Sequence, residues 1–95
     1  MFVIDLTYKV PLDQIDEYME SHAQFLDAHY GFGTFIASGR KVPRDGGIIL
    51  ATANSREDVE AIIKQDPFYQ HQLADYKITE FVVSKKATHL TDSFF

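Results

Sequence analysis

The stretch TFIASGRKVPRDGGIILATAN, residues 34–54, contains two expected strands with no helix between them. Residues 34–39 and 48–54 are rich in apolar and β-branched side chains, which are typical of strands. The segment between them, RKVPRDGG, contains proline, aspartate and glycine, which are typical of turns. We therefore expect two consecutive strands joined by a loop over residues 40–47.

A strand and a helix are expected before this stretch, and a helix and a strand after it. Residues 2–10 alternate between apolar and polar side chains, as a half-buried strand does, and residues 12–30 repeat apolar side chains at helical spacing. Ser55 is a typical N-cap for a second helix, and residues 76–85 alternate again. The order β-α-β-β-α-β predicts an α+β protein with a ferredoxin-like fold, as a single domain over residues 1–95.

The two strands expected over residues 34–39 and 48–54 have apolar side chains on both of their sides. Ile48 and Ile49, for example, point to opposite faces of the sheet. The helices of a ferredoxin-like fold cover one face of the sheet, so the second apolar face needs another cover. A chain of 95 residues has no further element to supply it. We therefore expect a second copy to cover this face in a two-fold homodimer, with a higher oligomer left open.

Composition excludes several classes of function. The formal charge is −5, which argues against nucleic acid or an anionic membrane as the main partner. The absence of cysteine excludes disulfides, thiolate metal sites and a cysteine nucleophile. No apolar run approaches the roughly 20 residues that span a bilayer, and the N-terminus lacks the basic start of a signal peptide. We therefore expect a cytoplasmic protein that does not enter the membrane.

The histidines do not form a recognisable metal-binding pattern. His22 and His29 lie two helical turns apart, about 10.5 Å along the axis, which is too far to share one zinc ion easily. Neither a phosphate-binding glycine loop nor a serine nucleophile elbow is present. We therefore expect no metal site and no cofactor.

Two polar residues stand where apolar or neutral ones are expected. His22 interrupts the apolar side of the first helix, and Asp66 lies at the end of the second, where a negative charge opposes the helix dipole. Each has a structural interpretation. His22 can pack its ring in a half-buried position with one hydrogen-bond partner. Asp66 can cap a further short helix that has Pro67 at its first position.

Residues 21–68, SHAQFLDAHYGFGTFIASGRKVPRDGGIILATANSREDVEAIIKQDPF, closely resemble the YciI-like (YCII-related) family. The matching motifs are H-x-x-F-L, F-x-A-S-G-R, G-G-I-I-L-A, S-R-E-D-V-E and D-P-F, in this order, and the resemblance extends from the first strand to about Phe81. It implies a ferredoxin-like fold that dimerises into an α/β barrel. It also implies a His-Asp pair in a cleft, which the motifs place at His22 and Asp66. Some relatives are linked to cofactor-free elimination from chlorinated aromatic acids or phenols.

The resemblance implies a function for His22 as a general base that Asp66 orients and stabilises, acting on a small aromatic acid or phenol by elimination or isomerisation. Ser38 and the backbone of Gly39 are candidates for hydrogen bonds to an anionic substrate, and Arg40 for a charge. The candidates for an apolar pocket wall are Phe25, Phe35, Phe68 and Tyr69, each of which can equally belong to the core.

Two other functions fit the same sequence. One is a non-catalytic dimeric protein that binds a small ligand or acts as an accessory, and the other is a cofactor-free monooxygenase or isomerase. The sequence also departs from the family pattern at two places. Residues 19–21, Met-Glu-Ser, stand where many relatives carry an arginine, and His71 stands where many have glycine.

Overall fold

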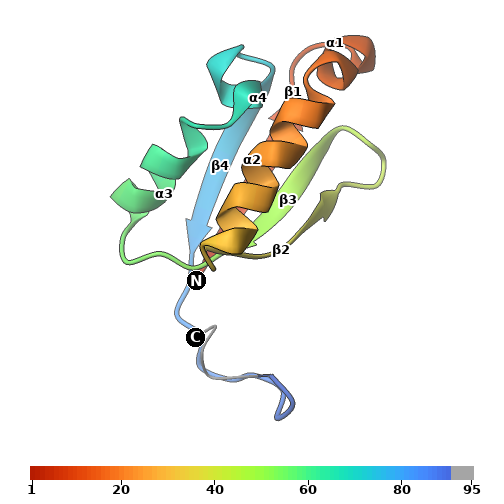
Figure 1. Ribbon diagram of the computed structural model, residues 1–95. Helices are drawn as coiled ribbons and strands as arrows, with labels where there is room; N and C mark the ends of the chain where they lie inside the picture. Colours follow the sequence, from red (N-terminus) through yellow and green to blue (C-terminus); the bar gives the residue numbers. More distant parts are fainter. Residues whose placement is uncertain (91–95) are drawn as a thin grey trace.

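A four-stranded antiparallel sheet with helices on one face forms the computed structural model, which describes residues 1–90 (Figure 1). The strands follow the order β2-β3-β1-β4 across the sheet, as a ferredoxin-like fold requires. The strands are β1 (Phe2–Tyr8), β2 (Phe35–Arg40), β3 (Gly46–Ala51) and β4 (Ala74–Glu80). The helices are α1 (Leu12–Glu17), α2 (Met19–Gly31), α3 (Arg56–Ile63) and α4 (Pro67–Gln70). The predicted element order and fold class are confirmed.

The core lies between the sheet and the helices. On β1 the side chains of Phe2, Ile4 and Leu6 are at most 2% exposed, which confirms the alternation expected for this strand. They pack in one cluster with residues from the other strands and from the helices, among them Ile15, Phe25, Phe35, Ile49, Val59 and Phe68. Burial of these side chains is the main stabilising contribution to the fold.

Strand β3 begins earlier than expected, because two glycines that resemble turn residues belong to it. Gly46 and Gly47 pair with Thr7 and Leu6 of β1. A Cβ atom on Gly46 would lie 1.8 Å from the carbonyl oxygen of Leu6, so only glycine permits this approach of the two backbones. The loop expected over residues 40–47 therefore shrinks to residues 41–45.

The long helix expected over residues 12–30 is wrong in one respect: it is interrupted at Tyr18. This residue has φ −109° and ψ 7°, outside the helical range, and separates α1 from α2. At the interruption the Tyr18 ring stacks on His71, with 4.2 Å between ring centroids. His71 lies just after α4, and helical periodicity within one segment does not specify such a tertiary contact.

The sheet face without helices combines apolar and polar side chains. Ile48 and Leu50 of β3 lie there and are only partly buried, whereas their neighbours Ile49 and Ala51 face the core. Beyond β4, residues 81–90 contain no helix or strand and extend away from the sheet past the N-terminus (Figure 1). No helix within residues 1–90 is long and apolar enough to cross a membrane.

Candidate active site

His22 and Asp66 lie 44 positions apart in the sequence and are in direct contact. His22 is in the first turns of α2, and Asp66 is the residue before α4. The His22 Nδ1 atom lies 2.8 Å from Oδ1 of Asp66. The Asp66 side chain is fully buried, and that of His22 is 12% exposed. A buried carboxylate is costly unless it is well paired, so this contact is a strong constraint on both side chains.

Both oxygens of Asp66 accept hydrogen bonds from other groups as well. Oδ1 accepts from the backbone N–H of Phe68 at 3.0 Å, and Pro67 occupies the first position of α4, so the predicted helix cap is confirmed. Oδ2 accepts from the hydroxyl of Tyr76 on β4 at 2.6 Å. Asp66 therefore caps α4 and contacts His22 at the same time, and the two interpretations of this residue are compatible.

The His22 ring is fixed by packing as well as by Asp66. It stacks on the Phe68 ring with 4.0 Å between centroids and 6° between planes. A carboxylate at Nδ1 favours the tautomer whose proton is on Nδ1, which leaves the lone pair on Nε2. Nε2 has no hydrogen-bond partner within residues 1–90. This arrangement presents Nε2 as a base to a molecule bound beside it.

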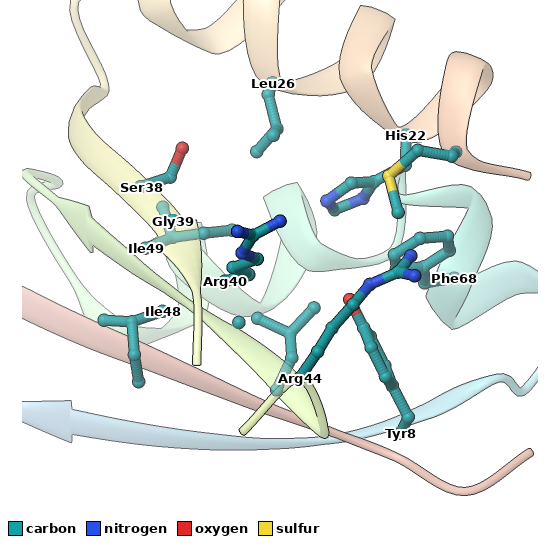
Figure 2. A pocket seen from close by; sticks show the side chains of 13 residues that line it. Tyr8, His22, Leu26, Ser38, Gly39, Arg40, Arg44, Ile48, Ile49 and Phe68 are labelled. Atoms are coloured by element: carbon teal, nitrogen blue, oxygen red, sulfur yellow. The ribbon is translucent and has the colours of Figure 1, made fainter. Parts of the chain in front are cut away.

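A cavity of about 340 Å³ lies beside His22, between the sheet and α2 (Figure 2). Most of its wall is apolar, and the polar groups come from β1, α2, β2 and the loop before β3. The lining residues are Leu6, Tyr8, Met19, His22, Leu26, Ser38, Gly39, Arg40, Arg44, Gly47, Ile48, Ile49 and Phe68.

The structure brings most of the residues predicted for the site to this cavity. A β-bulge between Phe35 and Ala37 shifts the register of β2, so that Ser38 pairs with Ile49 and Arg40 pairs with Gly47. Paired residues share a face of the sheet, and Ile49 faces the core. Ser38 and Arg40 therefore lie on the helix side of the sheet. Ser38 also has a partner, since its hydroxyl lies 2.6 Å from that of Tyr30.

Three of the predicted aromatic residues lie away from the cavity wall. Phe25 is buried in the core, 6.1 Å from the His22 ring, and packs edge-on against Phe35. The Tyr69 ring packs against Tyr76. Of the candidates for an apolar wall, Phe68 alone is among the lining residues.

Sequence analysis missed Tyr8, Arg44 and Tyr76. The alternation of β1 puts Tyr8 on the inner face, which was a usable signal, whereas Arg44 is in a segment that resembles a turn.

Burial raises the pKa of Tyr8, and the neighbouring Arg44 guanidinium opposes part of that rise. Burial, followed by the negative charge of Asp66, raises the pKa of Tyr76 far above its ordinary value. Both hydroxyls therefore keep their protons at neutral pH.

The residues at the two departures from the family pattern have clear positions. Met19 lines the cavity, and His71 stacks on Tyr18.

Of the other histidines, His29 is buried, and its Nε2 atom lies 2.9 Å from Oε1 of Gln65, within hydrogen-bond distance. Within residues 1–90 there is no group of three or more histidine or acidic side chains that could hold a metal ion.

Comparison with known proteins gives a family and a fold. The YCII-related domain matches residues 1–82. A similar solved structure is 5-chloro-2-hydroxyhydroquinone dehydrochlorinase from Burkholderia phenoliruptrix AC1100 in complex with 2,5-dihydroxybenzoquinone. Its TM-score is 0.72 at 15% identity, with 86% of this chain and 94% of that chain covered. At this identity the similarity shows the fold. No curated protein matches the sequence.

Proposed function

The chain belongs to the YCII-related domain family, and on this premise we propose that it is a cofactor-free enzyme acting on a small aromatic acid or phenol. His22 is the general base, and Asp66 is the residue that positions it. The reaction is proton abstraction followed by elimination or isomerisation. The observation that carries the proposal is the contact between Nδ1 of His22 and a fully buried carboxylate, at the wall of a cavity.

The proton chemistry follows from this contact. Asp66 accepts a hydrogen bond from Nδ1–H, which keeps that proton on Nδ1, so the Nε2 lone pair can take a proton from the substrate. The imidazolium that forms is stabilised by the adjacent negative charge, which lies within hydrogen-bond distance. General acid–base catalysis of this kind typically contributes about 10²–10⁴-fold to the rate.

The size and walls of the cavity support a one-ring substrate. A volume of about 340 Å³ is near the lower end of the range for small-molecule sites. Leu26, Ile49 and Phe68 supply apolar surface for a ring, and Ser38 and Arg40 supply polar groups beside it. The dehydrochlorinase of the same fold holds a one-ring dihydroxybenzoquinone, which agrees with this substrate class.

The functional unit in this proposal is a homodimer in which two sheets pack through their helix-free faces to form an α/β barrel. Ile48 and Leu50 on that face are only partly covered within one chain, and Val82 in the extended segment is 89% exposed. Apolar side chains of this kind gain from burial against a second copy.

Turnover of chlorinated hydroquinones and chlorinated hydroxybenzoic acids tests the function. The wild-type protein should release chloride or isomerise at least one of them, and His22→Ala should abolish most of that activity. His71→Ala is the matched control, because His71 lies outside the cavity wall. Binding without turnover would favour a ligand-binding or accessory protein, and oxygen uptake during turnover would favour a monooxygenase.

A further inference from the structure

Two arginines line the cavity of a protein whose overall charge is negative. The chain has nine Lys and Arg residues against fourteen Asp and Glu residues, yet Arg40 and Arg44 both contribute to one small, mostly apolar wall. The Arg40 side chain has no hydrogen bond or ion pair with any other residue of the described segment 1–90. Arg40 is exposed, whereas the Arg44 side chain is 32% exposed. A partly buried guanidinium attracts an anion more strongly than one in open solvent, because water screens it less.

The Arg44 guanidinium is held in place, but its contacts do not use all of its N–H donors. Its Nη2 atom donates to Oδ1 of Asp16 at 2.6 Å, and its guanidinium also interacts with the Tyr8 hydroxyl. A guanidinium has five N–H donors, so these contacts do not saturate it. Asp16 is 58% exposed, and ion pairs at such positions contribute little. A bound anion can therefore displace the Asp16 carboxylate from Arg44 or bind to Arg44 beside it.

Tyr8 adds a neutral donor to the same end of the cavity. Its hydroxyl keeps its proton at neutral pH and lies beside the Arg44 side chain (Figure 2). The Tyr8 and Phe68 rings pack edge to face at 89°, with 6.0 Å between centroids. Phe68 also stacks on His22. One aromatic ring thus separates the Tyr8–Arg44 end of the cavity from His22.

From this arrangement we infer that Tyr8 and Arg44 form an anion subsite, assisted by Arg40, which binds the carboxylate of a one-ring aromatic acid. The inference rests on the proposed function for the cavity and for the ring of the ligand. It narrows the substrate class from aromatic acids or phenols to aromatic carboxylates. It also assigns Asp16 as an internal competitor for Arg44. A planar carboxylate matches the fork of guanidinium N–H donors, and the Tyr8 hydroxyl supplies a further donor.

Binding of benzoate and benzamide, measured by calorimetry, tests the subsite, because the two molecules have the same shape and differ in charge. Benzoate should bind about 10-fold or more tightly than benzamide, as a charge-assisted hydrogen bond predicts. Arg44→Gln should weaken benzoate binding and leave benzamide binding nearly unchanged. Tyr8→Phe should weaken benzoate binding more than benzamide binding, because the amide oxygen of benzamide also accepts from a neutral hydroxyl. Arg56→Gln is the matched control, since Arg56 pairs with Glu60 outside the cavity. Phenyl phosphate is added to distinguish a carboxylate site from a general anion site, and tighter binding of phenyl phosphate than of benzoate would overturn the assignment.

A loss of binding can also come from misfolding, so a variant that is expected to bind more tightly gives a test that a folding defect cannot mimic. Asp16→Asn removes the competing carboxylate, so it should bind benzoate several-fold more tightly than the wild type, with no change for benzamide. Equal binding of benzoate and benzamide by the wild type, or no effect of Asp16→Asn, would overturn the inference. His22→Ala should retain the preference for benzoate even where it removes turnover. Failure of the catalytic proposal is thereby distinguished from failure of the subsite.

Discussion

The hydroxyl of Tyr76 donates a 2.6 Å hydrogen bond to Oδ2 of Asp66, the carboxylate whose other oxygen contacts His22. The three side chains come from β4, the N-terminus of α4 and α2, so the hydrogen bonds connect the sheet to two helices. Because Asp66 is fully buried, each bond to its carboxylate offsets part of the cost of removing a charge from water. Tyr76 thus supports the positioning of His22 without lining the cavity.

Tyr76→Phe should lower the free energy of unfolding by about 1.5–3 kcal/mol, the range for a lost hydrogen bond to a charged group. The ring remains, so packing changes little. Urea unfolding at pH 7 measures the effect. Tyr69→Phe is the matched control, because the Tyr69 ring packs against Tyr76 but its hydroxyl has no hydrogen-bond partner within residues 1–90. Equal stability of the two variants would show that the Tyr76 hydroxyl does not support Asp66.

The same hydroxyl predicts how stability changes in alkali. The pKa of Tyr76 is raised in the folded protein, above an ordinary value near 10. Above that ordinary value, the unfolded chain loses the Tyr76 proton while the folded chain keeps it, so unfolding is favoured as the pH rises. The wild type should lose up to about 1.4 kcal/mol per pH unit from Tyr76 above pH ~10. Tyr76→Phe should lose stability less steeply between pH 10 and 11, measured by urea unfolding. Parallel slopes for wild type and variant would contradict this.

Much of the fold could be predicted from local patterns. The alternation of Phe2, Ile4 and Leu6 identifies β1 and its buried face, since period-two burial is a property of one strand. The interruption at Tyr18 could not be predicted in this way, because it is associated with stacking on His71 from another element. The early start of β3 was missed because Gly46 allows a close approach to Leu6 that is defined only once β1 and β3 are paired.

Less of the candidate site than of the fold could be predicted from local sequence patterns. His22 and Asp66 were paired through family motifs, since no periodicity relates residues on different helices. Arg44 is in a loop whose composition indicates only a turn, and its approach to Tyr8 depends on the path of that loop. The bond from Tyr76 to Asp66 likewise depends on where α4 lies against β4.

Substitutions at two adjacent isoleucines of β3 test the homodimer. Ile48 lies on the helix-free face of the sheet, whereas Ile49 is 3% exposed in the core. Ile48→Asp should therefore separate the dimer into folded monomers. Ile49→Asp should unfold the chain, because an unpaired charge costs far more in the core than at an exposed position. Sedimentation velocity and circular dichroism distinguish the outcomes. A wild-type protein that remains a stable monomer at micromolar concentration would refute the dimer.

Asp66→Asn distinguishes a residue that only caps α4 from one that also positions His22. Asparagine caps helices about as well as aspartate, so a capping role alone predicts nearly unchanged stability and activity. The asparagine side chain can, however, donate to Nδ1 as well as accept from it, so it no longer enforces the tautomer with the proton on Nδ1. ¹⁵N NMR of the His22 ring should show the Nδ1–H tautomer in the wild type and a mixed or reversed tautomer in the variant. The ring signals of His29, His71 and His89 are internal controls.

Kinetics of the single and double variants complete the test of this pair. Asp66→Asn should lower kcat by about 10²-fold or more, as expected when a general base loses its orientation and charge stabilisation. His22→Ala should remove most of the remaining activity. Because Asp66 acts through His22, adding Asp66→Asn to His22→Ala should cost little more, and the two losses should not add. Additive losses, or an unchanged His22 tautomer in Asp66→Asn, would leave Asp66 as a helix cap with no part in the chemistry.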